Sequence, residues 1–257
     1  MDRRAKVIEL NDRQYRDFQE GLRWNIGTLL PDGRILGKLP EDGGIAVTAD
    51  VGNDARITDL FRRTDTENKR ILELGCFEAH HTVSIAALCK EVVAVEVRPA
   101  NIINALVRLY VHGVSNVRIV MKDVREIDTT FGKFDILFHA GILYHLENPV
   151  EHFYRIAGIA PVLLLDTQFC YDDTQYERSD IIFNGRTYRA HLWKESGWEE
   201  PLSGLDSYSR WLHKDALIQL LQDTGYTDIE ETCIIDMPVG PRIAIMAKHN
   251  SKATSPR

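Results

Sequence analysis

The chain has 257 residues, of which 44% are hydrophobic and 27% are charged. Such a chain can bury a sizeable core, which excludes a disordered protein outside the tails. The formal net charge of −7 gives no general attraction to a nucleic-acid backbone. No run approaches the roughly 20 apolar residues of a membrane span, and no secretory signal opens the chain, so we expect a cytoplasmic protein.

The first part, residues 1–66, is expected to be an extension of helices and loops. Residues 11–21 predict a helix that has Tyr15 and Phe18 on one face and ends at Gly21. The run 27–44 is rich in glycine and proline and predicts a loop with one short hairpin. Asn53 or Asp54 can cap a second helix.

A regular alternation of strands and helices begins at Arg70, inside the main domain expected over residues 67–250. Apolar strands are predicted at 71–74, 92–97, 117–121, 134–140 and 161–167, with helices at about 80–89, 99–112 and 149–158. Nearly all-apolar strands between amphipathic helices predict an α/β fold with a doubly wound, mostly parallel sheet.

The alternation stops over residues 168–206. This segment follows the carboxyl end of a strand, where doubly wound sheets bind ligands, so we expect an inserted lid over the acceptor site. A helix at about 213–224 and strands at about 228–235 and 242–247 follow. Gly240 and Pro241 between these strands predict an antiparallel hairpin. Residues 251–257 are expected to form a disordered tail.

The segment after the first strand points to the kind of ligand. It reads GCFEAH from Gly75, whereas a dinucleotide site needs G-x-G-x-x-G for close approach to a pyrophosphate. Phe77 and Ala79 stand where glycines are expected. Glu73 ends the first strand and Glu96 the second, where a carboxylate can accept hydrogen bonds from ribose hydroxyls. These features predict an adenosine-bearing ligand without phosphates.

Four segments in order resemble the motifs of the class I S-adenosylmethionine-dependent methyltransferases. They are ILELGCFEAHHT, VVAVEVRPANI, VRIVMKDVREI and FDILFHAGILYHLENP. The residues of these segments are similar to the motifs of a branch that includes tRNA wobble-uridine carboxymethyltransferases and many small-molecule methyltransferases. The resemblance implies a Rossmann-like sheet of seven strands with an antiparallel C-terminal hairpin, and S-adenosyl-L-methionine as the cofactor.

The resemblance also implies residue roles. Glu73 and Gly75 would line the methionine part of the cofactor, Glu96 would hold the ribose, and Asp123 would bind the adenine amino group. The residues around the end of the fourth strand would face the methionine amine and the sulfonium. The implied cofactor-binding set is Glu73, Gly75, Cys76, Phe77, His81, Glu96, Val97, Asp123, Val124, Ala140 and Gly141.

Methyl transfer from a sulfonium needs alignment and one base. His145, just beyond the fourth strand, is the candidate base, with Tyr144 beside it; the alternative is that His145 only caps a helix or shapes the pocket. Trp193, Trp198, Tyr208 and Arg210 are the candidate acceptor-site residues, although packing alone can explain such aromatic side chains. No set of three spaced ligands favours a metal.

The sequence therefore favours methyl transfer to oxygen or nitrogen of a polar small molecule by direct displacement. Three alternatives stay open: a tRNA-modifying transferase, which needs a basic groove; a nicotinamide-dependent oxidoreductase, which needs the missing glycines; and a non-catalytic partner protein of the same fold. The acidic balance argues against a nucleic-acid partner, and no membrane partner is expected. The identity of the acceptor and the presence of a homo-oligomer stay undetermined.

Overall fold

The computed structural model describes residues 8–30, 32–38, 45–47, 54–171 and 176–250. The expected disordered tail, residues 251–257, lies outside the described residues. The chain divides into two compact units, Met1–Val124 and Arg125–Arg257. Within the described part of the chain, no helix is both long and apolar enough to cross a bilayer.

The first unit opens with the predicted helix α1 (Asp12–Gly21). The Asn11 side chain accepts a hydrogen bond from the Gln14 amide while the Gln14 side chain accepts one from the Asn11 amide, which caps the helix. Strand β1 (Ile26–Leu29) pairs antiparallel with β2 (Ile35–Leu36), the expected hairpin, and parallel with β3 (Ile45–Val47). Helix α2 (Ala55–Arg62) begins at its predicted cap, Asp54.

The alternating elements of the first unit follow the prediction closely. They are β4 (Arg70–Leu74), α3 (His80–Leu88), β5 (Glu91–Glu96), α4 (Pro99–Val111) and β6 (Val117–Met121); the short helix η3 (Val124–Glu126) begins at the last residue of this unit. The strands β4, β5 and β6 are parallel neighbours. Every residue of β4 and β5 after the first is buried, so these strands read as continuous apolar runs with an acid near the end.

The second unit holds β7 (Ile136–Ala140), η4 (Leu143–His145), α5 (Pro149–Ile156), β8 (Val162–Gln168), α6 (Lys214–Asp223), β13 (Tyr226–Met237) and β14 (Gly240–His249). Strand β7 is parallel to β8, whereas β14 is antiparallel to both β8 and β13. The C-terminal hairpin is confirmed, but the two strands are longer than predicted. Gly240 pairs with Met237 inside the ladder, so the turn lies at residues 238–239 and not at Gly240 and Pro241.

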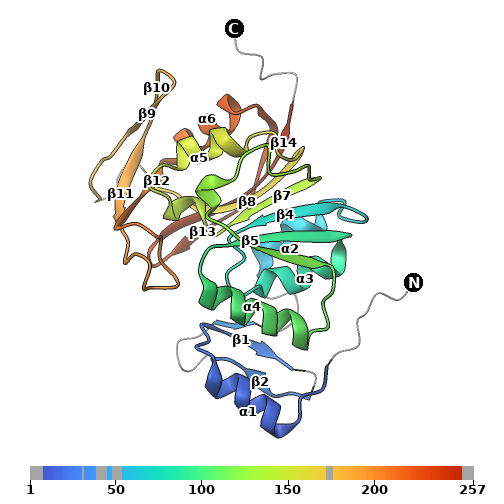
Figure 1. Ribbon diagram of the computed structural model, residues 1–257. Coiled ribbons are helices and arrows are strands. Elements are labelled where there is room, and N and C mark those ends of the chain that lie inside the picture. Colours follow the sequence, from blue (N-terminus) through green and yellow to red (C-terminus); the bar gives the residue numbers. More distant parts are fainter. Residues whose placement is uncertain (1–7, 31, 39–44, 48–53, 172–175, 251–257) are drawn as a thin grey trace. The chain divides into compact units, whose positions relative to one another are not determined.

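The main sheet has seven strands in the order β13-β14-β8-β7-β4-β5-β6. Figure 1 shows β13, β14, β8 and β7 of the second unit side by side. The expectation of a mostly parallel Rossmann-like sheet with an antiparallel C-terminal end is confirmed.

The segment 168–206 and the residues just after it contain strands that the periodicity did not predict. Strand β9 (Ile181–Phe183) pairs antiparallel with β10 (Arg186–Tyr188), and β11 (Ala190–Lys194) pairs with β12 (Tyr208–Leu212). Asn184 and Gly185 between β9 and β10 have φ values of +49° and +73°. An Asn-Gly pair with two positive φ angles forms the tight two-residue hairpin turn, so this dipeptide was the available signal.

A buried histidine pair lies in the core of the second unit. His139 of β7 and His152 of α5 have their Nε2 atoms 2.9 Å apart, and both side chains are buried. The Nδ1 atoms of both rings are buried without a hydrogen-bond partner. Burial lowers the pKa of His139 to about 4 and places the pKa of His152 well below its usual value. Both rings are therefore neutral in the folded protein at neutral pH.

This pair predicts an acid-sensitive core. An unfolded histidine gains its proton near pH 6.5, whereas folded His139 gains it only near pH 4. The unfolding free energy should thus fall as pH drops through this window, by about 3 kcal/mol from His139 alone. Replacing both histidines by leucine should flatten the dependence, because apolar groups replace both partners at little cost. Urea unfolding of the wild-type protein and of the double-leucine variant between pH 7 and pH 4 measures the unfolding free energy. An equal change of this free energy with pH in the two proteins would contradict the prediction.

Candidate functional site

Two buried carboxylates stand near the carboxyl ends of β4 and β5. Glu73 is 3% exposed and Glu96 is 6% exposed. Because β4, β5 and β6 are parallel, their carboxyl ends meet at one edge of the sheet, and Asp123 follows β6 at that edge. The structure therefore brings together the strand-end acids that the sequence singled out.

Glu73 has an unsatisfied carboxylate. Its Oε2 atom is buried and has no hydrogen-bond partner. Burial raises the pKa of Glu73 to about 7. A buried polar atom without a partner costs free energy and often marks a place where a ligand supplies the missing group. A primary ammonium, such as the amine of a bound amino acid, would satisfy this oxygen.

The loop after β4 has an unusual backbone. Gly75, Phe77 and Ala79 have φ values of +71°, +52° and +61°. The two side-chain-bearing residues thus adopt the left-handed conformation for which glycine is preferred. The Gly75 and Cys76 amides both donate to the Val95 carbonyl, at 2.9 and 3.0 Å, which ties the loop to β5. The absent glycines have therefore not removed the left-handed backbone conformations.

Glu96 connects this loop to the start of α4. Its Oε1 atom accepts hydrogen bonds from the Val97 amide at 3.0 Å and the Arg98 amide at 2.9 Å. Its Oε2 atom accepts from the Phe77 amide at 3.0 Å. Burial raises the pKa of Glu96 while these hydrogen bonds oppose the rise. A carboxylate oxygen has two lone pairs, so Oε2 can accept one more donor, such as a ribose hydroxyl.

The other residues of the implied cofactor set are placed less uniformly. His81 has its Nε2 atom 3.7 Å from an Asp54 carboxylate oxygen, so it has a protein partner. Cys76 is buried, and burial raises the pKa of its thiol. Val124 begins η3. Ala140 and Gly141 belong to the second unit, where the Gly141 amide donates to the Asp166 carbonyl at 3.0 Å.

In the second unit, His145 forms a dyad with Glu195. The His145 Nδ1 atom lies 2.9 Å from Glu195 Oε1, and the two side chains are 20% and 2% exposed. Burial opposes ionisation of Glu195, but the contacts with His145, Ser203 and Gly204 outweigh it and lower its pKa to about 2. An ionised carboxylate can only accept, so Nδ1 donates the hydrogen bond. In the neutral ring, Nε2 then carries the free lone pair.

Glu195 itself is held by three further donors. The hydroxyls of Ser203 and Ser209 and the amide of Gly204 donate to its carboxylate at 2.5, 2.7 and 2.7 Å. A Cβ atom on Gly204 would lie 2.6 Å from the His145 carbonyl oxygen, so only glycine allows this approach. The segment 168–206 thus supplies Glu195, Ser203 and Gly204 to the surroundings of His145.

Tyr144 has a charged neighbour that the sequence did not indicate. Arg242 Nη1 donates to the Tyr144 hydroxyl at 3.3 Å, while Arg242 Nε donates to the buried Asp166 carboxylate at 2.5 Å. An Arg242 nitrogen also lies 3.6 Å from the position of a Cβ on Gly141. Arg242 is 98 residues from Tyr144 in the chain, so no local pattern could reveal the contact.

Three of the four expected acceptor-site residues lie near the dyad. Tyr208 donates its hydroxyl to Glu147, and Arg210 Nη1 donates to the Glu147 carbonyl at 2.6 Å, so both hold the segment that follows His145. Trp193 stacks on Trp211 at 4.3 Å between ring centroids, and Trp211 packs edge-to-face on Tyr144. Trp198 is 49% exposed.

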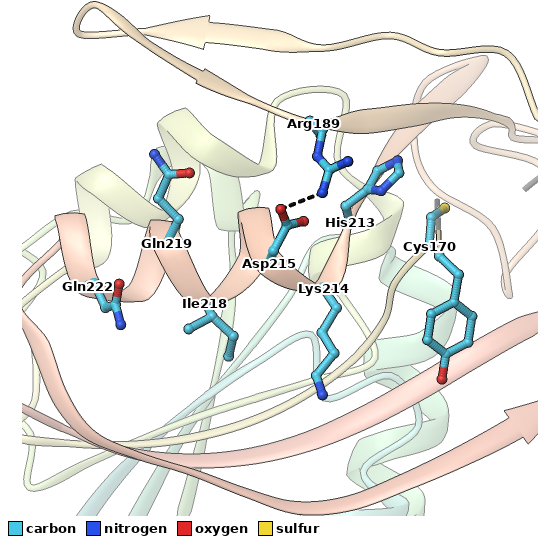
Figure 2. A pocket seen from close by; sticks show the side chains of 9 residues that line it. Cys170, Arg189, His213, Lys214, Asp215, Ile218, Gln219 and Gln222 are labelled. Carbon is cyan, nitrogen blue, oxygen red and sulfur yellow. Dashed lines mark hydrogen bonds and ion pairs between the residues drawn. The ribbon is translucent and has the colours of Figure 1, made fainter. Parts of the chain in front are cut away.

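A cavity of about 440 Å³ lies elsewhere in the second unit, against α6 (Figure 2). Arg189 and Asp215 form an ion pair at 2.5 Å beside it, and Lys214 pairs with Glu231 at 2.6 Å. Its lining residues are Cys170, Tyr171, Arg189, His213, Lys214, Asp215, Ile218, Gln219 and Gln222. None of the sequence-predicted site residues lines this cavity.

Comparison with known proteins identifies the family. The family model described as nodulation protein S, NodS, matches residues 52–181. The chain belongs to the NodS family. A relative, nodulation protein S of Bradyrhizobium diazoefficiens, is 29% identical over 115 residues, which cover 45% of this chain. The match spans 54% of the length of that NodS protein.

Solved structures agree on the fold. The N-terminal domain of EvdMO1 with SAH bound has a TM-score of 0.75 and 24% identity, covering 96% of this chain and 100% of that domain. Magnesium protoporphyrin IX methyltransferase from Synechocystis has a TM-score of 0.54 and 14% identity, covering 77% of each chain. The NodS-family chain therefore has the class I S-adenosylmethionine-dependent methyltransferase fold, as the sequence motifs predicted.

The unpartnered carboxylate oxygen of Glu73 should lower the stability of the unliganded protein and strengthen cofactor binding. With a folded pKa near 7 and an unfolded value near 4.5, the unliganded protein should lose about 3 kcal/mol of unfolding free energy as pH rises through that window. Glu73→Gln should abolish this loss and raise the melting temperature at pH 8, yet weaken cofactor binding. Thermal unfolding from pH 4.5 to 8 is the measurement.

Glu91→Gln, at the opposite end of the neighbouring strand β5, is the matched control, because Glu91 is part-exposed and paired with Arg70. It should leave the pH slope unchanged. A Glu73→Gln protein that unfolds with the wild-type pH dependence would contradict the assignment of this slope to Glu73.

Proposed function

We propose that this protein transfers a methyl group from S-adenosyl-L-methionine to an oxygen or nitrogen of a polar small molecule by direct displacement. The NodS family and the methyltransferase fold support the reaction class. The observation that carries the proposal is the buried, unpartnered oxygen of Glu73, which lies at the sheet edge where Glu96 also ends its strand.

The proposed cofactor contacts use groups with remaining capacity. Glu73 Oε2 would accept from the methionine amine, and Glu96 Oε2 would accept from a ribose hydroxyl. Asp123, which follows β6, would bind the adenine amino group. Cys76, Phe77, His81, Val97 and Val124 lie in or next to the same segments and complete the first unit's part of the proposed set.

The proposed chemistry uses few protein groups. S-adenosyl-L-methionine supplies an activated methyl group on a sulfonium, so the protein contributes mainly alignment and a base. His145 Nε2 would take the acceptor proton as the acceptor atom bonds to the methyl carbon, the carbon–sulfur bond breaks and S-adenosylhomocysteine leaves. Glu195 would keep His145 in the required tautomer and stabilise the imidazolium that results.

The acceptor is proposed to lie beside Tyr144 and His145, with Trp193, Tyr208 and Arg210 shaping its surroundings. Trp198, half exposed on the inserted segment, would contact the acceptor as part of the lid. The 1,6-didemethyltoxoflavin-N1-methyltransferase of Burkholderia thailandensis shares this fold, with a TM-score of 0.54 and 16% identity, covering 78% of this chain and 81% of that one. Its acceptor, bound in that structure, is a small molecule.

Calorimetric titration tests the cofactor assignment. We expect S-adenosylmethionine and S-adenosylhomocysteine to bind with micromolar Kd values and NADH not to bind. Glu96→Ala should cost about 1 to 3 kcal/mol of binding free energy, because buried donors lose their acceptor. Absence of binding by both sulfur ligands would refute the proposal and favour a non-catalytic protein of this fold.

Turnover assays test the dyad once screening of polar small molecules has found an acceptor. His145→Gln should lower kcat by about 10²- to 10⁴-fold, the usual contribution of a general base. Glu195→Gln should lower kcat as well and displace the pH profile of kcat, because His145 loses its ionised partner. Both variants should bind S-adenosylhomocysteine with the wild-type Kd. Unchanged kcat in His145→Gln would assign the histidine a structural role.

A further inference from the structure

The loop after β4 contains a buried acidic residue. Glu78 is completely buried and lies between Phe77 and Ala79, whose φ values are +52° and +61°. Residues other than glycine are disfavoured in this conformation and persist there only when surrounding contacts hold them. The loop therefore needs an anchor that a glycine-rich loop would not need.

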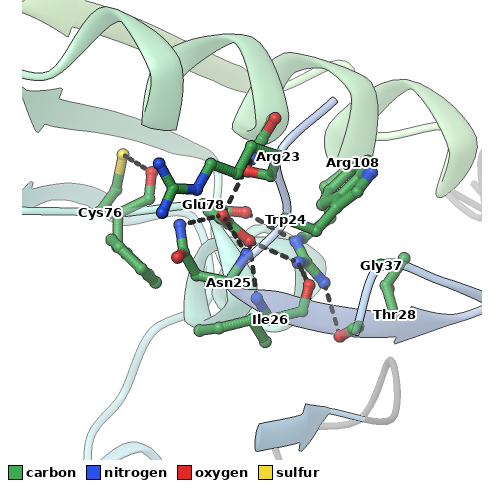
Figure 3. A network of polar contacts seen from close by, with 12 residues as sticks. Arg23, Trp24, Asn25, Ile26, Thr28, Gly37, Cys76, Glu78 and Arg108 are labelled. Carbon is green, nitrogen blue, oxygen red and sulfur yellow. Dashed lines mark hydrogen bonds and ion pairs between the residues drawn. The ribbon is translucent and has the colours of Figure 1, made fainter. Parts of the chain in front are cut away.

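The carboxylate of Glu78 meets several donors from distant parts of the first unit (Figure 3). Its Oε1 atom accepts from the Asn25 amide at 2.8 Å, from Asn25 Nδ2 at 2.9 Å and from Asn104 Nδ2 at 2.8 Å. Its Oε2 atom accepts from the Ile26 amide at 3.0 Å and lies 3.4 Å from Arg108 Nη2. The side chain of one loop residue is thus bound by the N-terminal segment and by α4.

Arg108 holds the backbone of the same residue. Its Nε atom donates to the Glu78 carbonyl at 2.6 Å, and its Nη1 and Nη2 atoms donate to the carbonyls of Gly27 and Ile26 at 3.1 and 2.6 Å. The Arg108 side chain is 1% exposed. A buried ion pair that is also held by several hydrogen bonds is costly to break on one side, so it is suited to fixing a conformation.

We propose that Glu78 is a positioning residue for the cofactor site. The N-terminal segment 25–27, which binds Glu78, therefore helps to position that site. Glu78 holds Phe77 and Ala79 in the left-handed conformation, and the Phe77 amide then reaches Glu96 Oε2. The anchor replaces the conformational freedom that glycines supply in other nucleoside-binding loops. This inference rests on the proposed function for the identity of the ligand, but not for the role of Glu78 in the loop.

The test compares Glu78→Gln, Ala79→Gly and the double variant with the wild-type protein. Glutamine places an NH₂ group among donors, so the anchor weakens. We expect the Kd for S-adenosylhomocysteine to rise at least tenfold in Glu78→Gln. Hydrogen exchange of the Phe77 and Ala79 amides should accelerate by a similar factor. Ala79→Gly should recover at least threefold of the lost affinity in the Glu78→Gln background, because glycine adopts the left-handed conformation without help.

Thr28→Val is the matched control. Thr28 Oγ1 lies 2.7 Å from His112 Nε2, so it ties the residue after segment 25–27 to the end of α4 through a hydrogen bond that does not involve Glu78. This variant should lower the melting temperature and leave both the Kd and the loop exchange rates at wild-type values. Should Glu78→Gln fail to fold, Asn25→Ala removes a single side-chain donor and should raise the Kd and the exchange rates about threefold.

The two readouts separate the outcomes. Wild-type Kd and wild-type exchange in Glu78→Gln, or in Asn25→Ala if that variant is used, would overturn the inference. Equal loss of affinity in Thr28→Val would also overturn it, because the effect would then follow stability alone. If the wild-type protein does not bind S-adenosylhomocysteine, the proposed function fails, and the exchange rates of Phe77 and Ala79 alone decide whether Glu78 holds the loop.

Discussion

The proposed cofactor-binding edge of the first unit depends on Glu78, a completely buried side chain whose hydrogen bonds are made within the protein. Glu78 joins the N-terminal segment, helix α4 and the loop after β4 through one set of hydrogen bonds. The loop in turn presents the Phe77 amide to Glu96. Because each contact fixes the next, the geometry at the ends of β4 and β5 is determined by residues far apart in the chain.

The second unit also contains a buried carboxylate with hydrogen bonds inside the protein, but there it orients a histidine ring. Glu195 is buried, ionised and surrounded by donors, and it fixes the orientation of a ring that is only part-buried. In each unit a carboxylate forms its own hydrogen bonds within the protein and holds a neighbouring group that can still accept a hydrogen bond or a proton. This group is Glu96 in the first unit and His145 in the second. Fixed dipoles of this kind cost no reorganisation when a ligand or a proton arrives.

The sequence predicted the sheet because its strands are continuous apolar runs with an acid near the end of β4 and of β5. It predicted Glu73, Glu96 and His145 for the same reason, since each lies at a strand end or just beyond one. It could not predict Glu78 or Glu195, because their partners lie as much as 53 and 50 residues away. The strands β9 to β12 were missed since they are short and carry mixed polar and aromatic residues.

A crystal structure of the protein with S-adenosylhomocysteine would test the central claim most directly. The claim is that a loop without the usual glycines keeps a cofactor-ready conformation because the protein holds it from outside. We predict Glu73 Oε2 within hydrogen-bond distance of the ligand's amino group, with Phe77 and Ala79 still at positive φ. A ligand bound elsewhere, or a loop that leaves the left-handed conformation to admit it, would contradict this account.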